Sequence, residues 1–224
     1  MRWADPAASL PVRRRSSGCA LAFWVALEAT VSGVWSSSAW GDCDVDTAYV
    51  QVAKTLKTGL GLALCQYDDR PIYLGSINAL GTQDVTAAFL KSARQLHYGS
   101  FFLHTGLRSS APELVRRARA LGLSISLDTN WDPEERWNDT LAEVLSLVDV
   151  FFPKEQEVQL IAGQDSLQAA ASALHAHGVG LLAVKRGSLG TVVFTRDACF
   201  AQGVQPVPEG GDAGAAEGRP VFEE

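Results

Sequence analysis

The feature that most constrains the fold is the stretch from residue 144 to residue 190, which has the pattern of a strand, a helix and a second strand. Residues 148–152 (VDVFF) form a short β-branched and aromatic run closed by Pro153, which favours a buried strand over a helix. The apolar run 181–184 predicts the second strand. Two strands joined through a helix are normally parallel with a right-handed crossover, so this stretch predicts an α/β sheet.

The segment between these two strands, residues 155–177, predicts a helix in two pieces. The pieces are separated near Gly163, Asp165 or Ser166 is placed to cap the second piece, and Gly178 is placed to end it. A helical connection of this length is what a parallel crossover requires.

Strand and helix patterns also alternate upstream of this stretch. The predicted elements are a hairpin of strands at residues 57–66 and 71–77, a helix from Thr82 as N-cap to Ala93, a strand at 98–104, a helix opened by Ser110 and stopped by Gly122, a strand at 123–127 and a helix at 138–147. Alternation of this kind predicts a parallel, doubly wound sheet. Ligands of such sheets bind at the carboxyl ends of the strands, where residues 153–157 and 185–190 fall.

Composition narrows the class of protein. The chain has 224 residues, 47% of them apolar, enough for one domain with a sizeable core. Its net charge of −6 argues against a nucleic-acid partner. The four cysteines show no C-x-x-C spacing, so neither zinc nor disulfides are required and a reducing cytoplasm is the default location. Three arginines before an apolar run at 19–27 resemble part of a signal peptide, but the run is too short to span a bilayer.

The predicted domain organisation has three parts. Residues 1–40 are expected to be an unrelated, disordered leader, residues 41–200 the folded domain, and residues 201–224 a disordered tail rich in Gly, Ala, Pro and Glu.

Several residues at the predicted strand ends are candidates for binding chemistry. Gly187 and Gly190 follow a strand, where exposed amides can meet phosphate, although such a turn is also common in ordinary loops. Lys185 either reaches a phosphate or only flanks the strand. Glu157 either holds a magnesium-bound water or is a favourable charge near a helix start. Asp128 and the asparagine two residues later either orient a ligand or form an Asx turn, and the histidines are interpreted as structural.

Taken together, these segments resemble the ribokinase-like (PfkB-type) carbohydrate kinase family. The resemblance rests on residues 44–50 (DVDTAYV), 58–75, 99–106, 126–130 (SLDTN) with Trp137, 150–157 (VFFPKEQE) and 184–190 (VKRGSLG), which occur in the order and spacing of the family. It covers roughly residues 41–194.

The resemblance implies a ribokinase-like α/β fold whose sheet is doubly wound and mostly parallel. It also implies a remnant of a small β-hairpin lid and a domain that is truncated at both ends. It implies transfer of a phosphoryl group from ATP to a sugar hydroxyl, with ATP and magnesium as cofactors. By the resemblance, Glu157 matches the glutamate of the Asn-x-x-Glu motif that organises magnesium, while Lys185, Gly187 and Gly190 match the nucleotide-side turn.

The chain also departs from the family pattern. Lys154 stands where the motif has asparagine, and it either repels the metal or takes over part of its role. Asp212, within residues 209–213 (EGGDA), is the nearest match to the aspartate of the Gly-Ala-Gly-Asp motif that acts as catalytic base. The hypothesis is therefore a weakly active or inactive form of a cytoplasmic sugar kinase, with a homodimer possible and membrane association unlikely. The alternative is a non-catalytic nucleotide-binding or interaction module. Missing neighbours would also leave residues 181–184 as an exposed apolar strand edge.

Overall fold

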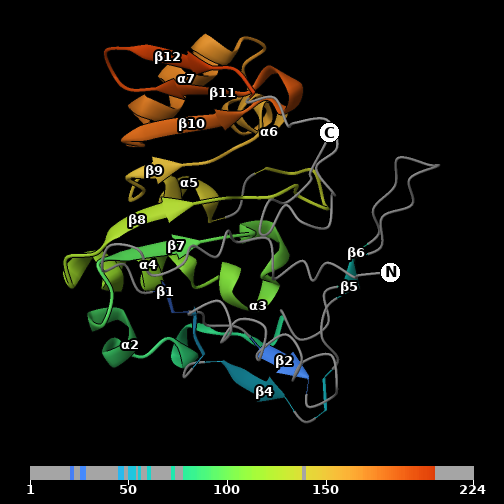
Figure 1. Ribbon diagram of the computed structural model, residues 1–224, viewed down its shortest axis with the longest axis vertical. Coiled ribbons are helices and arrows are strands. Elements are labelled where there is room, and N and C mark those ends of the chain that lie inside the picture. Colours follow the sequence, from blue (N-terminus) through green and yellow to red (C-terminus); the bar gives the residue numbers. More distant parts are fainter. Residues whose placement is uncertain are drawn as a thin grey trace, which may run out of the picture. The chain divides into compact units, whose positions relative to one another are not determined.

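The structure is a computed structural model that describes residues 78–137 and 140–204, together with short pieces at 21–22, 26–28, 45–47, 50–53, 55–56, 60–61 and 72–73 (Figure 1). The chain forms two compact units, which we describe separately. One consists of Met1–Leu80 with Glu209–Val221, and the other of Gly81–Pro208 with Phe222–Glu224.

In the first unit, the described residues form short paired strands. Strand β1 (Leu21–Ala22) pairs in parallel with β3 (Val45–Asp46), β2 (Ala26–Glu28) pairs in parallel with β4 (Gln51–Ala53), and β5 (Leu60–Gly61) pairs antiparallel with β6 (Ile72–Tyr73). The last pairing confirms that the two strands predicted as a hairpin lie antiparallel, while the predicted turn between them lies outside the described residues. The domain boundaries at 40 and 200 stay predictions.

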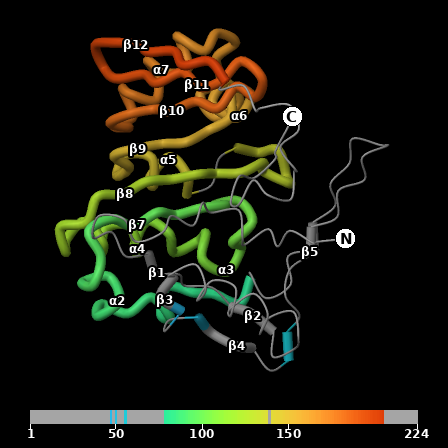
Figure 2. Tube along the Cα trace, in the orientation of Figure 1, coloured from blue at the N-terminus to red at the C-terminus, as the bar shows by residue number. Residues whose placement is uncertain are grey.

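The second unit is built on a six-stranded sheet in the order β12-β11-β10-β9-β8-β7. Its strands are β7 (Gln95–Tyr98), β8 (Ser124–Leu127), β9 (Val150–Phe151), β10 (Leu181–Lys185), β11 (Thr191–Phe194) and β12 (Cys199–Gln202). Strands β7 to β10 are parallel, and β11 and β12 are added antiparallel. Figure 2 shows the colours running in sequence order across the sheet, so each strand lies beside its neighbour in the chain. The predicted mixed α/β, mostly parallel sheet is confirmed.

The helices of this unit connect the parallel strands. They are α2 (Ala87–Lys91), α3 (Thr105–Arg108), α4 (Ala111–Ala120), α5 (Leu141–Leu145), α6 (Glu155–Ala162) and α7 (Leu167–Ala176), with 3-10 turns η3 (Thr82–Asp84), η4 (Phe101–Leu103) and η5 (Gly187–Leu189). Each crossover from β7 to β10 steps in the same direction along the sheet. Because such crossovers are right-handed, the connecting helices α4 to α7 lie on one face. No described helix is long and apolar enough to cross a membrane.

Alternate residues of the parallel strands form the core under these helices. Ile125, Leu127, Phe151, Leu182 and Val184 are each at most 1% exposed. Since side chains alternate across a strand, the residues between them point to the opposite face. The polar residues described below lie on the side of that opposite face.

The division of the long connecting helix follows the sequence prediction. Gly163 ends α6 with a left-handed backbone (φ 60°), and the Ser166 hydroxyl caps α7 by accepting the Ala169 N–H at 3.1 Å. Of the two predicted caps, the structure therefore uses Ser166 and not Asp165. Gly178 (φ 114°) follows the end of α7, as expected for a glycine stop.

Two predicted elements are wrong. Residues 98–104 are not one strand, because β7 ends at Tyr98 and Ser100 turns the chain with φ 54° into η4. This turn brings the Phe101 N–H to the Asp128 carbonyl at 3.1 Å and buries Phe101 completely, so the apolar run belongs to a buried turn. The helix predicted from Thr82 begins only at Ala87, and its cap is the Thr86 hydroxyl, which accepts the Phe89 N–H at 3.2 Å.

The expected exposed edge at residues 181–184 is also wrong. Strand β10 has a neighbour on each side, with Leu182 in register with both Phe151 of β9 and Phe194 of β11. Strand β12, which sequence reasoning did not find, is the outer edge of the described sheet, and all its residues are exposed.

Candidate functional site

The carboxyl ends of β8, β9 and β10 lie next to one another. Ser126 of β8 is in register with Val150 of β9, which is in register with Leu181 of β10. The pairing continues beyond β9, where Lys154 forms a parallel bridge with Lys185 and the Lys185 N–H donates to the Pro153 carbonyl at 2.8 Å. The register therefore gathers the segments that follow the three strands at one edge of the sheet.

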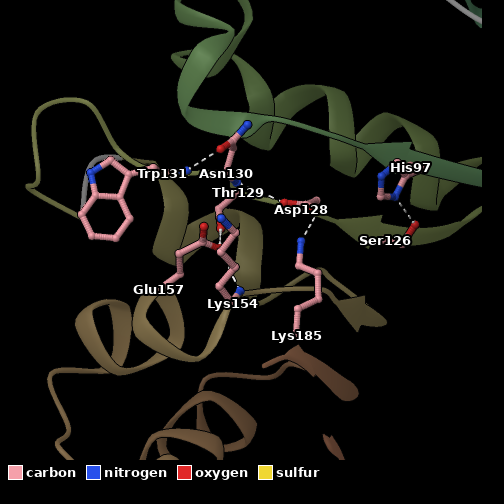
Figure 3. Close-up of polar contacts among 9 residues, drawn as sticks. All are labelled: His97, Ser126, Asp128, Thr129, Asn130, Trp131, Lys154, Glu157 and Lys185. Atoms are coloured by element: carbon pink, nitrogen blue, oxygen red, sulfur yellow. Dashed lines mark hydrogen bonds and ion pairs between the residues drawn. The ribbon is translucent and has the colours of Figure 1, made fainter. Parts of the chain in front are cut away.

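Asp128, directly after β8, makes two contacts at this edge. Its Oδ2 accepts a hydrogen bond from Lys185 Nζ at 2.6 Å, and its Oδ1 accepts the Asn130 N–H at 3.1 Å (Figure 3). The second contact is the predicted Asx turn, and the first adds an ion pair. The side chains of Asp128 and Lys185 are 29% and 43% exposed, so water screens the pair and its contribution to stability is small.

Glu157 is the buried acid of the site, with only 1% of its surface exposed. Its Oε2 accepts the Lys154 N–H at 2.9 Å and the Thr129 hydroxyl at 3.4 Å. Its Oε1 is buried and has no hydrogen-bond partner among the residues that the structure describes. Burial raises the pKa of the Glu157 carboxyl above its ordinary value of 4.5, against the opposing effects of the Lys154 N–H and the charge of Lys185.

The position of Glu157 follows from its place in the helix. It is the third residue of α6, so its carboxylate reaches back to the amide of Lys154, the N-cap residue. The structure thus places Glu157 near a helix start, as both predicted roles require, and one carboxylate oxygen remains for another partner. Magnesium often binds through one or two carboxylates plus waters and phosphates, which fits a single free carboxylate oxygen. The described part of the chain contains no group of three or more His, Cys, Asp or Glu side chains able to form an all-protein metal cage.

The glycine turn after β10 has a backbone that other residues adopt poorly. Gly187 has φ 53° and Gly190 has φ 83°, and the Gly190 N–H donates to the Gly187 carbonyl at 2.9 Å. A Cβ on Gly190 would overlap the carbonyl oxygen of Gln202 in β12. The turn thus permits close packing of Gly190 against the backbone of β12, while the predicted approach of these glycines to a phosphate stays a prediction.

A polar group formed by His97, Ser126 and Gln95 was not predicted from the sequence. His97 of β7 is in register with Ser126, and its Nδ1 lies 2.9 Å from the Ser126 hydroxyl, which also accepts from the Gln95 amide at 2.8 Å. Burial lowers the pKa of His97, which favours the neutral ring, while the nearby Asp128 charge acts in the opposite direction. The signal in the sequence is the two-residue spacing of Ser126 and Asp128, which places both on one face.

Backbone strain also gathers near this edge. Ser100, Asn130, Glu135 and Trp137 are non-glycine residues with φ between 51° and 57°. Asp132, which is 2% exposed, holds the loop after β8 by accepting the N–H groups of residues 134, 136 and 137 at 2.9–3.0 Å. Such conformations are uncommon for residues with a Cβ and concentrate at functional sites.

The structure thus brings together most of the residues predicted for the site. Lys154, Glu157 and Lys185 lie with Asp128 at one edge of the sheet, as Figure 3 shows, and Gly187 and Gly190 follow β10 directly. Asp212 lies outside the described residues.

Comparison with known proteins identifies the family. Residues 36–210 match the pfkB family of carbohydrate kinases, which is most of the chain. The chain belongs to this family. A cytidine kinase of Thermococcus kodakarensis is 28% identical over 129 residues, which cover 56% of this chain and 44% of that protein. The present chain therefore spans less than half the length of that cytidine kinase.

Solved structures show the same fold. A fructokinase with bound ATP from Xylella fastidiosa has a TM-score of 0.78 at 23% identity, covering 93% of this chain and 68% of that one. A putative ribokinase II from E. coli, in complex with ATP and Mg²⁺, has a TM-score of 0.76 at 22% identity, covering 91% and 66%. At these identities the likeness establishes a ribokinase-like fold and does not extend to a substrate.

Proposed function

We propose that this chain binds ATP with magnesium at the carboxyl ends of β8, β9 and β10 and transfers a phosphoryl group to a hydroxyl of a sugar-containing acceptor. The observation that carries the proposal is the convergence of Glu157, Lys185 and Asp128 at one edge of the sheet, beside the glycine turn. Phosphoryl transfer depends mainly on positioning and charge, and this edge offers both cations and a carboxylate.

The described residues suit separate parts of this task. The Lys185 ammonium and the turn that contains Gly187 and Gly190 would contact phosphate oxygens, since Lys185 is partly exposed at the edge and the turn follows it in the chain. The unpartnered Oε1 of Glu157 would hold magnesium through a water molecule. Magnesium bound there would neutralise charge on the phosphates. Lys154 would add a second ammonium on the phosphate side.

We further propose slow turnover, with Asp212 as the base. The acids described at this edge already have partners, because Asp128 is paired with Lys185, Glu155 is paired with Arg186, and Glu157 is buried and hydrogen-bonded. A general base must lie within hydrogen-bond reach of the acceptor hydroxyl and be free to take its proton. The same observation favours a second candidate function, a nucleotide-binding module without catalysis.

The decisive experiment measures ADP release from Mg-ATP with a panel of acceptors that includes hexoses, pentoses and ribonucleosides, among them fructose and cytidine. We expect slow release with at least one acceptor, and a loss of at least tenfold in Lys185→Met, because a charge-assisted phosphate contact contributes more than about 1.5 kcal/mol. Lys91→Met, which removes an exposed lysine in α2, is the charge-matched control. Binding of Mg-ATP without release for any acceptor would favour the non-catalytic module.

The partners and location follow from the same proposal. We propose a cytoplasmic protein whose partners are ATP and a small sugar-containing acceptor, with no nucleic acid, in line with the net charge of −6. A homodimer is part of the proposal, and the molar mass measured by light scattering tests it.

A further inference from the structure

Two lysine side chains lie side by side at the candidate site. Lys154 and Lys185 form the parallel bridge that extends the pairing of β9 and β10. Bridged residues of parallel strands project their side chains to the same side of the sheet. Figure 3 shows both lysines extending toward the segment after β8 that begins with Asp128. The edge therefore carries two neighbouring ammonium groups.

Only one of these ammonium groups has an anion beside it. Lys185 is paired with Asp128 at 2.6 Å, whereas Lys154 is exposed and forms no ion pair within 4.0 Å with any residue in the described ranges. The Glu157 carboxylate accepts the backbone N–H of Lys154, and the carboxylate of the adjacent Glu155 accepts a hydrogen bond from Arg186 at 2.9 Å. The Lys154–Lys185 bridge, the Lys185–Asp128 pair and the hydrogen bond from the Lys154 N–H to Glu157 join the four residues in one connected group.

Among the described residues, the two lysines have one contacting carboxylate between them, Asp128. The lysine pair and Asp128 together carry a net charge of +1, since two positive charges face one negative charge. The lysine pair is therefore short of contacting negative charge, in a protein whose overall net charge is −6.

We propose that Lys154 and Lys185 form a two-lysine clamp that binds the polyphosphate of a nucleotide without a divalent cation. This inference rests on the proposed nucleotide site and specifies how its phosphates are held. Each ammonium has three donors and no acceptor, so it suits phosphate oxygens. Because the Asp128–Lys185 pair is partly exposed and therefore weak, a phosphate can take the place of Asp128 beside Lys185.

The clamp has a measurable consequence for the coupling between metal and nucleotide. Two side-chain cations supply charge that a divalent ion would otherwise supply, so adding magnesium raises the ATP affinity only a few-fold. Losing the Lys154 ammonium removes charged hydrogen bonds to phosphate, which corresponds to roughly a ten- to hundredfold weaker affinity in the absence of metal. Screening by salt weakens the binding further, since both groups lie near the surface.

The test is isothermal titration calorimetry of the full chain with tripolyphosphate and with ATP, first in EDTA and then with excess magnesium. The variants are Lys154→Asn, which keeps a polar side chain without the charge, and Lys91→Asn as the charge-matched control on α2. Thermal melts of each variant show whether it is folded. We expect the native chain and Lys91→Asn to bind both ligands in EDTA, and Lys154→Asn to bind them at least tenfold more weakly.

The outcomes separate the clamp from the proposed function. ATP binding that appears only with magnesium overturns the clamp and leaves the kinase proposal standing. Equal affinities for Lys154→Asn and the native chain in EDTA also overturn the clamp. Tripolyphosphate binding in EDTA that depends on Lys154, together with no ATP binding under either condition, overturns both the nucleotide clamp and the proposed nucleotide site.

Discussion

The helix-covered face of the sheet and its carboxyl edge are built from the same strands, yet they differ in almost every physical respect. On the covered face, Phe151 and Leu182 are fully buried and pack as an apolar layer. At the edge, Asp128 directly follows β8 and Lys185 is the last residue of β10, and the two are partly exposed and paired by charge. The comparison shows that position along a strand decides what a residue does. Apolar residues inside the strand stabilise the fold, and polar residues at the end of the strand are available for chemistry.

The two regions also differ in backbone strain. The strand interiors have ordinary conformations, whereas Ser100 and Asn130 take left-handed backbones within three residues of the ends of β7 and β8. Each such residue costs on the order of 1 kcal/mol or more. The paired strands and the buried Asp132 carboxylate hold these segments in place. Local strain of this kind is tolerated because the covered face supplies the stability.

The largest expected effect comes from breaking the covered face. Phe151→Ala removes a side chain with no exposed surface, so we expect a loss of about 3–5 kcal/mol in the free energy of unfolding. Urea denaturation of the full chain measures it. The molecules that remain folded should still bind Mg-ATP with native affinity. A loss below about 1 kcal/mol would show that this face is not the main source of stability.

A smaller effect is expected at the junction of the two regions. Gly190→Ala places a Cβ against the Gln202 carbonyl in a backbone with φ 83°, so we expect a loss of roughly 1–3 kcal/mol, concentrated in β11 and β12. Amide hydrogen exchange of residues 191–194 reports it. Gly203→Ala is the matched control, because a Cβ there meets no atom within 4 Å. Equal exchange in the two variants would contradict the close approach.

A helix cap far from the edge should change stability alone. Ser166→Ala removes the acceptor for the Ala169 N–H, and we expect a loss of about 1 kcal/mol with unchanged nucleotide affinity. Ser172→Ala, on the exposed side of the same helix, is the control. Thermal unfolding followed by calorimetry compares the two variants. A change in ATP affinity with Ser166→Ala would show that the regions are coupled.

The smallest expected effect concerns the pH dependence of the free energy of unfolding. Because burial raises the pKa of Glu157, its carboxyl stabilises the fold most below pH 4.5, and this contribution is lost as the pH rises through the higher pKa of the folded state. Glu157→Gln cannot ionise and still accepts the Lys154 N–H. We therefore expect the variant to gain stability relative to the native chain as the pH increases from 4.5. Unfolding measured over this range tests the sign, and a constant difference would contradict it.

Much of the fold was predictable because local patterns and tertiary structure agree. The short apolar runs ended by Pro153 and Lys185 became β9 and β10, and Gly163 and Ser166 divided the helix where their chemistry suggests. Glu157 and Lys185 were found because they follow strands. The turn at Ser100 was missed, because a left-handed serine inside an apolar run leaves no local signal.

Contacts between distant segments were harder to predict. The Asp128–Lys185 pair depends on the registers of β8, β9 and β10, which no local pattern specifies. The same holds for His97 and Ser126, which meet only because β7 and β8 pair residue by residue. Strand β12 was missed because its side chains are all exposed and its pattern lacks an apolar period.

The order of the strands has a consequence for how this sheet assembles. Every strand from β8 to β12 pairs with the strand before it in the sequence. Each new pairing therefore closes a loop of moderate length, and the entropy cost of loop closure grows only slowly with length. Sequential pairing keeps the contact order lower than pairing between distant strands would, and a lower contact order favours faster folding. The sheet can grow outward from β7 one strand at a time, so the charged edge is completed only when β10 arrives and Lys185 reaches Asp128.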